Sequence, residues 1–175
     1  MDKFQVNIYI ETSIHGPAIK TAAGMYIIEY ILKSGEAETR SGILFRDNTT
    51  ENALALETLE GAFRRLTKSC SVGVNTGCTH ILNVMNNHYL PVWEKNGWIN
   101  AKKKPVANRE LWQQLKETMD VHAVSFRSEY YSYRKRMVFD LEKAMEAYRI
   151  GEEYHPDGQG KRVPAMSEGG YWIIW

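Results

Sequence analysis

Two stretches near the N-terminus, residues 4–11 and 23–45, show three β-strand patterns in close succession, and this limits the possible fold more than any other feature. The first, FQVNIYIE, alternates apolar residues with polar or aromatic ones, as a strand with one buried face does. The second, AGMYIIEYILKSGEAETRSGILF, reads as two strands around a Ser-Gly-Glu turn at 34–36. Strands joined by such a turn pair antiparallel. The N-terminal part of the chain is therefore predicted to form an antiparallel meander.

Helical patterns alternate with two short strands in the following hundred residues. The clearest helix begins after a cap supplied by Asn48, Thr49 or Thr50, where a broad apolar face starts. Further strands are predicted at 70–75 and 121–126, and further helices at 79–87, at 88–98 with a break at Pro91, at 108–120 and at 132–150. A meander followed by this alternation implies an α/β fold with a five-stranded mixed sheet, antiparallel and then parallel, flanked by helices.

The composition indicates one globular domain with a boundary near residue 150. The chain has 175 residues, of which 43% are hydrophobic and 25% charged, enough for one domain at 1–150. Residues 151–175 form a C-terminal extension that is rich in Gly, Pro and charge and ends in YWIIW. We expect this aromatic end, Tyr171 to Trp175, to dock on the domain; the alternative is an exposed patch that binds a protein partner.

Several classes of protein are disfavoured by the same sequence. The longest apolar run is only a few residues, so we expect no membrane span. Cys70 and Cys78 lack the number for a disulfide scaffold and the spacing for a metal site, which favours buried thiols in a reducing cytoplasm. The five histidines are scattered without ligand spacing, so a zinc site is not expected.

A basic stretch punctuated by tryptophans lies at 93–112, WEKNGWINAKKKPVANRELW. Because the net charge of the chain is only +1, affinity for nucleic acid must come from a local patch such as this one. A lysine run alone is typical of a solvated turn, and a tryptophan on a periodic helix face is typical of a core. The basic residues are Lys95, Lys102, Lys103, Lys104 and Arg109, and the tryptophans are Trp93, Trp98 and Trp112.

The element order and this stretch together resemble type 1 ribonuclease H, with weaker similarity over roughly residues 4–148. The family's basic protrusion follows W-x-K-x-G-W-x-x-A-x-K-K-P-V-x-N-x-x-L-W. The matching residues are Trp93, Lys95, Gly97, Trp98, Ala101, Lys103, Lys104, Pro105, Val106, Asn108, Leu111 and Trp112. The resemblance implies that this surface binds an RNA–DNA hybrid. The residues implied as contacts are Trp93, Lys95, Trp98, Lys102, Lys103, Lys104 and Asn108, together with Asn48, Thr49 and Thr50 in place of the family's Thr-Asn-Asn helix start.

Family members hold two divalent ions, Mg²⁺ or Mn²⁺, with four carboxylates, because two dications close together must be neutralised. Carried over one position at a time, the resemblance places Glu11 first, Ala53 second by an ungapped match, Asn75 third and Asp140 fourth. Charge pairs at about 4 Å are worth about 4 kcal/mol at a moderate effective dielectric, so the loss of two anions should cost several kcal/mol of ion binding.

Compensation for the missing carboxylates is one alternative. Glu57 lies one helical turn beyond Ala53, on the same helix face, and Glu51 lies just before it. For Asn75, the loop residue Glu129 would have to move in. Glu11 and Asp140 are expected to converge and to hold at most one weakly bound ion.

The sequence therefore favours a ribonuclease H homologue that binds RNA–DNA hybrid or other duplex nucleic acid with lost or strongly reduced catalysis. The second reading is an active metal-dependent hybrid endoribonuclease that uses Glu11, Asn75, Asp140 and Glu57. The third is a protein-interaction module that binds through its aromatic C-terminus.

Overall fold

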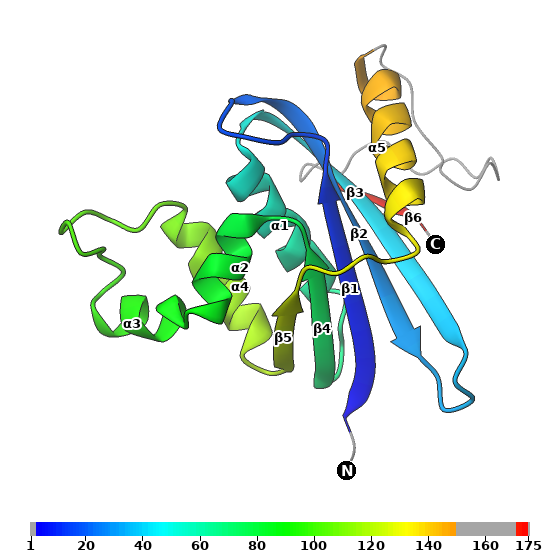
Figure 1. Ribbon diagram of the computed structural model, residues 1–175, viewed down its shortest axis with the longest axis horizontal. Coiled ribbons are helices and arrows are strands. Elements are labelled where there is room, and N and C mark those ends of the chain that lie inside the picture. Colours follow the sequence, from blue (N-terminus) through cyan, green and yellow to red (C-terminus); the bar gives the residue numbers. More distant parts are fainter. Residues whose placement is uncertain (1–2, 150–170, 175) are drawn as a thin grey trace.

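The computed structural model describes residues 3–149 and the backbone of residues 171–174, and it contains one six-stranded sheet (Figure 1). The strands are β1 Phe4–Thr12, β2 Lys20–Ile31, β3 Ala37–Thr49, β4 Cys70–Thr76, β5 Ala123–Arg127 and β6 Tyr171–Ile174. Their order across the sheet is β5-β4-β1-β2-β3-β6. Strands β1, β2 and β3 form the antiparallel meander, while β4 runs parallel to β1 and β5 runs parallel to β4. The predicted mixed sheet is confirmed.

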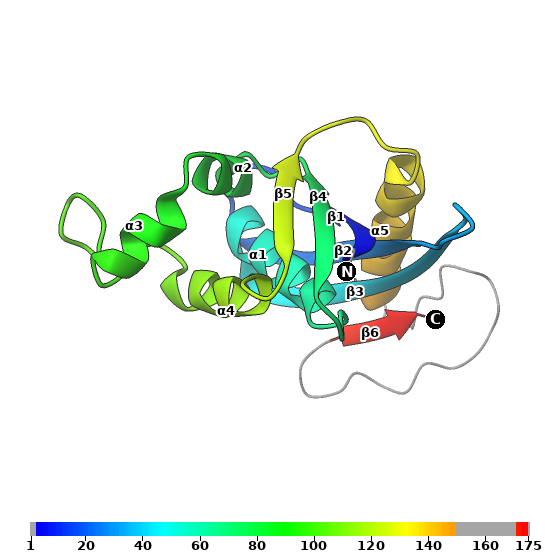
Figure 2. The same ribbon diagram turned by 90° about the horizontal axis from the view of Figure 1, so that it is seen from below.

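All five predicted strands are present, and the aromatic end of the chain adds a sixth strand, β6, to the sheet. Strand β6 pairs antiparallel with β3 from Ser41–Ile174 to Leu44–Tyr171 (Figure 2). Without it, β3 would present a row of unpaired N–H and C=O groups at the edge of the sheet. The loop expected at 151–170 and the terminal Trp175 lie outside the described residues.

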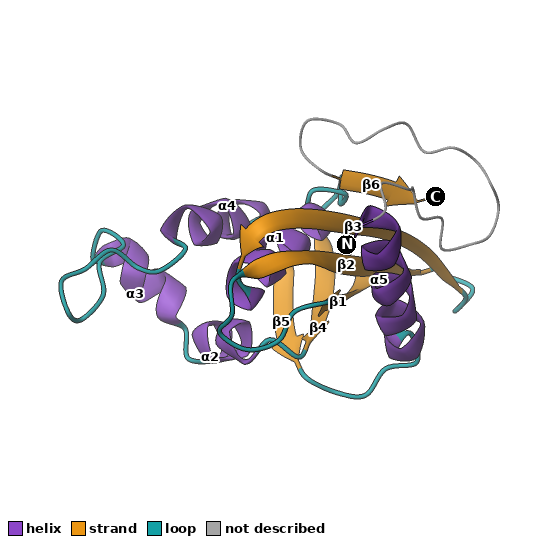
Figure 3. Ribbon diagram, turned by 90° about the horizontal axis from the view of Figure 1, so that it is seen from above, coloured by secondary structure: helices purple, strands orange, loops and turns teal. Residues whose placement is uncertain are grey.

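Five helices are described, and they cover both faces of the sheet (Figure 3). They are α1 Glu51–Phe63, α2 Thr79–Asn86, α3 Tyr89–Lys95, α4 Arg109–Met119 and α5 Arg134–Arg149. Helix α1 packs on one face with α4 against it, and α5 packs on the opposite face over β1 and β2. None of the helices in the described part of the chain has the length and apolar content to cross a bilayer.

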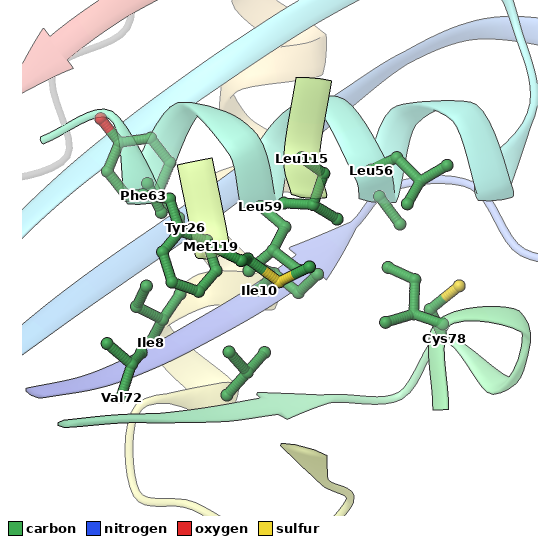
Figure 4. Close-up of a cluster of buried hydrophobic side chains, with 14 of the residues drawn as sticks. Ile8, Ile10, Tyr26, Leu56, Leu59, Phe63, Val72, Cys78, Leu115 and Met119 are labelled. Carbon is green, nitrogen blue, oxygen red and sulfur yellow. The ribbon is translucent and has the colours of Figure 1, made fainter. Parts of the chain in front are cut away.

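Helix α1 is the centre of the larger core. Its N-cap is Thr50, whose side chain accepts a hydrogen bond from the Ala53 N–H at 3.2 Å, one of the predicted capping residues. Leu56, Leu59 and Phe63 meet the apolar residues of β1 and β4 beneath the helix (Figure 4). Successive side chains of a strand point to opposite faces of the sheet. Val6, Ile8 and Ile10, at every second position of β1, therefore all point into this core.

Helix α3 contains Pro91 and is not broken by it, contrary to the prediction. Pro91 is the third residue of the helix, which begins at Tyr89. The first four N–H groups of a helix have no intrahelical partner, so a residue without an N–H loses no helical hydrogen bond there. Helix α3 and the loop after it project away from the sheet as a separate protrusion (Figure 1).

Candidate active site and nucleic-acid interface

A cleft of about 440 Å³ opens at the end of the sheet where β1 and β4 finish. Three acidic residues line it: Glu11 at the end of β1, Glu51 at the start of α1, and Glu129 in the segment that joins β5 to α5. Asn75, in β4, also lines the cleft, and β4 places it beside Tyr9 of β1. In Figure 1 the connection from β5 to α5 passes across β4 and β1.

The helical carboxylate of the cleft is Glu51, which the sequence reading had placed just before the matched position. Its Oε2 accepts a hydrogen bond from the Gly16 N–H at 3.0 Å, and its Oε1 lies 3.6 Å from His15 Nδ1. Glu57 is not brought to the cleft, because its Oε2 accepts a 2.7 Å hydrogen bond from Arg46 Nε. That ion pair borders a different pocket, together with Leu111.

The helix geometry explains why Glu51, and neither Ala53 nor Glu57, faces the cleft. At about 100° per residue, six residues separate the directions of Glu51 and Glu57 by about 240°. Strand β3 extends to Thr49 and α1 begins at Glu51, so Glu51 is the first residue of the helix and Ala53 the third. An acid in the first turn is also favoured by the helix dipole, and this signal could have identified Glu51 from the sequence.

Glu11 is held by two side chains from beyond β5. The Tyr131 hydroxyl donates a hydrogen bond to Glu11 Oε1, and Arg134 Nε lies 3.4 Å from the same oxygen. The Tyr131 ring is buried and stacks on Tyr9 at a centroid distance of 4.8 Å. Burial, reinforced by the hydrogen bond to Glu11, raises the pKa of Tyr131. The hydroxyl therefore remains a proton donor to the carboxylate at neutral pH.

Asn75 is 3% exposed and bonds the peptide groups of Glu129 on both sides. Its Nδ2 donates to the Glu129 carbonyl at 3.1 Å, and its Oδ1 accepts from the Glu129 N–H at 3.2 Å. The amide offers a donor and an acceptor on separate atoms, whereas an ionised aspartate offers acceptors alone. The two hydrogen bonds to Glu129 therefore explain why an amide occupies this position, and the residues next to Asn75 in the sequence do not reveal them.

Asp140, the fourth predicted site residue, is buried in α5. It is 2% exposed, on α5, with Oδ2 3.6 Å from Arg136 Nε. It is not among the described residues that line the cleft. The convergence of Glu11 and Asp140 therefore stays a prediction, since Asp140 does not line the cleft that contains Glu11.

The donor set of the cleft does not fit a pair of divalent ions as the side chains stand. Mg²⁺ and Mn²⁺ bind oxygen ligands, with one or two carboxylates and the remaining positions filled by water or other oxygens, so a pair of ions needs carboxylates that are free to bind them. Glu11 is occupied by Tyr131 and Arg134, and Asn75 by Glu129. Across the described residues, no cluster of three or more His, Cys, Asp or Glu side chains is arranged to hold an ion.

The protrusion displays the lysine run at the tip of a small hairpin. Asn100 Oδ1 accepts hydrogen bonds from the backbone N–H groups of Lys102 and Lys104 at 2.9 and 3.1 Å. Residues 98–106 are closed by a bridge between Ile99 and Pro105 and by backbone bonds between their ends. All three lysines, Lys102 to Lys104, and Lys95 at the end of α3, are exposed.

Trp93 and Trp98 anchor this hairpin to α4. Trp93 lies between Trp98 and the fully buried Trp112, with ring centroids 6.3 and 5.9 Å away. Both are half-buried and pack against the main core. The contacts of Trp93 and Trp98 in the structure are therefore packing contacts that hold the lysine hairpin against α4.

The other predicted contact residues occupy different settings. Asn48 is exposed at the end of β3 with a left-handed backbone, φ +49°, whereas Thr49 is buried and Thr50 caps α1. Asn108 precedes α4, also left-handed, and is half-buried. Asn48 and Asn108 thus have conformations that asparagine tolerates better than most residues.

Comparison with known proteins agrees with this architecture. The RNase H family model matches residues 4–128. Ribonuclease H of Clostridium botulinum is 34% identical over 122 residues, covering 70% of this chain and 80% of that protein. Ribonuclease H of Caldicellulosiruptor saccharolyticus is 37% identical over 82 residues, covering 47% of this chain and 57% of that protein.

Two solved structures share the fold at low sequence identity. The crystal structure of LC9-RNase H1, a type 1 RNase H with the type 2 active-site motif, superposes with a TM-score of 0.69 at 21% identity, covering 93% of this chain and 83% of that one. The foamy viral protease-reverse transcriptase in complex with RNA/DNA hybrid gives a TM-score of 0.56 at 19% identity, covering 81% of this chain and 19% of that one. With a family model that spans most of the chain and relatives of this coverage, the chain belongs to the ribonuclease H family.

Proposed function

We propose that this ribonuclease H family protein binds RNA–DNA hybrid, or another nucleic-acid duplex, through its lysine hairpin, with catalysis strongly reduced. The observation that carries the proposal is the state of Glu11, whose carboxylate is engaged by Tyr131 and Arg134. The same chain exposes Lys102 to Lys104 on a hairpin anchored by tryptophans. The hairpin therefore offers a cationic surface for binding phosphates, while the carboxylate of Glu11, which would hold an ion, is bonded to Tyr131 and Arg134.

The hybrid is the ligand that the family membership supports. The foamy viral structure is of a complex with RNA/DNA hybrid, and a related structure is of a complex with dsDNA. A backbone-tracking basic surface of this kind carries affinity through phosphates and does not by itself select a sequence. Both cysteines are free and buried, which favours a reducing compartment such as the cytoplasm.

A second candidate, an active metal-dependent endoribonuclease, is supported by Glu51. Its carboxylate borders the same cleft as that of Glu11, so the site has one more anion than the ungapped match had assigned. If the segment over the cleft moved away, Glu11, Glu51 and the oxygen of Asn75 would offer ligands of the kind that Mg²⁺ and Mn²⁺ prefer.

The test is to incubate the full chain with an end-labelled hybrid in Mg²⁺ and, separately, in Mn²⁺, and to measure binding and cleavage in the same samples. We expect retention of the hybrid with little or no cutting. Glu51→Gln is the informative variant, because it removes one cleft anion and no part of the hairpin. Metal-dependent cuts that disappear in Glu51→Gln would replace this proposal with the endonuclease.

A further inference from the structure

The segment 128–134, between β5 and α5, is fastened over the cleft at four points. Asn75 holds both peptide groups of Glu129, Tyr131 bonds Glu11, and Arg134 pairs with Glu11. The fourth point is Tyr133, whose hydroxyl donates to Glu29 Oε2 at 2.6 Å. These contacts join the segment to β1, β2 and β4, so it is a fixed cover of the sheet and not a free loop.

Arg134 and Tyr131 satisfy a carboxylate that burial would otherwise leave uncompensated. The Glu11 side chain is 10% exposed, and the Arg134 side chain is 62% exposed. A carboxylate this far from water needs a cation or donors beside it. The arginine supplies charge from the solvent side, while the tyrosine supplies a donor from the buried side.

The same positions around Glu11 cannot also take a divalent ion. An ion at Glu11 Oε1 would stand beside the Arg134 guanidinium, which is 3.4 Å from that oxygen, and like charges at such a distance repel. Because Arg134 is mostly solvated, it can leave Glu11 at little desolvation cost. Ion and arginine therefore compete for one carboxylate.

Asn75 decides which of the two arrangements is held. Its amide matches the donor and the acceptor of the Glu129 peptide groups at 3.1 and 3.2 Å. An aspartate there would set an anionic oxygen against the Glu129 carbonyl and would add a charge that attracts an ion. The amide favours the covered state on both counts.

We propose that residues 128–134 form an internal plug, in which Arg134 and Tyr131 take the place of a divalent ion at Glu11 and Asn75 is the positioning residue that holds the plug closed. This rests on the proposed function, since it gives the reason for reduced catalysis. It goes beyond that function in one respect: the ion site is covered by the plug, and weakening the plug should restore ion binding at Glu11.

Isothermal titration calorimetry of the full chain with Mn²⁺ alone tests the plug without any cleavage assay. We expect Arg134→Gln to bind Mn²⁺ about tenfold more tightly than the unmodified chain, the size of effect given by removing one charged hydrogen-bonding competitor. Lys135→Gln is the matched control, because it removes the same charge from the next, exposed residue and leaves the Glu11 contacts intact. It should stay within about twofold of the unmodified chain.

Two Asn75 variants separate positioning from charge. Asn75→Ala adds no ligand, yet it should raise Mn²⁺ affinity and speed hydrogen exchange of the Glu129 amide, which it leaves without its 3.2 Å acceptor. A merely structural role would lower stability and leave Mn²⁺ affinity unchanged or weaker. Asn75→Asp should bind Mn²⁺ more tightly than Asn75→Ala, because it adds an anion.

The plug is refuted if Arg134→Gln binds Mn²⁺ no more tightly than Lys135→Gln, or if Asn75→Ala leaves affinity unchanged. Adding Glu11→Gln to Arg134→Gln should remove the gain, and persistence of the gain would place the ion elsewhere and also refute the plug. Hybrid binding without metal, measured on the same proteins, reports on the proposed function separately, since the lysine hairpin is untouched by these changes.

Discussion

Replacing Lys102, Lys103 and Lys104 together by Gln should flatten the salt dependence of hybrid binding. The three lysines are exposed at one hairpin tip, where Asn100 fixes the backbone of the first and the third. Gln keeps the side-chain length and polarity and removes the charge. The hairpin bonds to Asn100 use backbone N–H groups, so the substitution leaves them in place.

The magnitude follows from counterion release. Each phosphate neutralised on a duplex contributes about −0.9 to the slope of log affinity against log salt, so three contacts contribute about −2.7. Between 50 and 200 mM salt, the unmodified chain should lose about 40-fold more affinity than the triple variant. Fluorescence anisotropy of a labelled hybrid of about 20 base pairs, across a salt series without divalent ions, measures both slopes.

The control is a second triple variant with Gln at Lys33, Lys68 and Lys143. Lys33 follows the end of β2 and Lys68 precedes the start of β4, both at the end of the sheet opposite the cleft, and Lys143 is in α5. Helix α5 lies on the other face of the sheet from α1 and α4 (Figure 3). Its net charge change is the same, so it corrects for the field of the whole molecule. Equal slopes for the two triple variants would show that the hairpin is not the phosphate-binding surface.

Three further predictions concern the scaffold. Thr50→Ala removes the cap of α1 and should lower the free energy of unfolding by about 1 kcal/mol in urea titrations, with Thr50→Ser close to the unmodified chain. Gly42→Ala would place a Cβ 2.6 Å from the Tyr26 ring and should destabilise by about 1–3 kcal/mol through overpacking, seen as a lower midpoint. The hydrogen bond to Glu29 raises the pKa of Tyr133 to about 12. The folded chain therefore keeps this proton to a higher pH than the unfolded chain does, so the resulting stabilisation is full below pH 10 and is lost as the pH rises through about 12. This pH dependence of the free energy of unfolding should disappear in Tyr133→Phe.

The fold was predictable because its periodicities are local. The alternating residues in 4–11 and the helical repeat from Leu54 to Phe63 are patterns within single segments, and both elements appear where predicted. The β6 pairing was not predictable from its own residues, since it depends on the free edge of β3 more than a hundred residues earlier. The pattern of apolar residues within a segment indicates which of its side chains are buried, but it does not indicate which strand the segment pairs with.

The site was predicted less well, because its members depend on contacts between distant segments. Glu11 and Asn75 were identified from strand ends, but the amide of Asn75 has its partner 54 residues away at Glu129. The ungapped match pointed to Ala53 and, one turn beyond it, to Glu57, whereas the helical carboxylate that lines the cleft is Glu51, two residues before Ala53. A helix rotates by about 100° per residue, so small boundary errors move a site carboxylate to the wrong side.

Three acids line the cleft, and each has a partner supplied by the chain itself. Glu11 has Arg134 at 3.4 Å, Glu129 has Arg127 at 3.8 Å, and Glu51 has the Gly16 N–H at 3.0 Å. Glu11, whose side chain is 10% exposed, needs such compensation most, whereas the Glu129 side chain is 71% exposed and is also solvated. Here the compensation is covalently part of the protein, whereas a metal site leaves it to bound ions. The arginines beside Glu11 and Glu129 make the cleft less repulsive to a phosphate backbone than uncompensated carboxylates would be, and this supports the proposed binding of a duplex without metal.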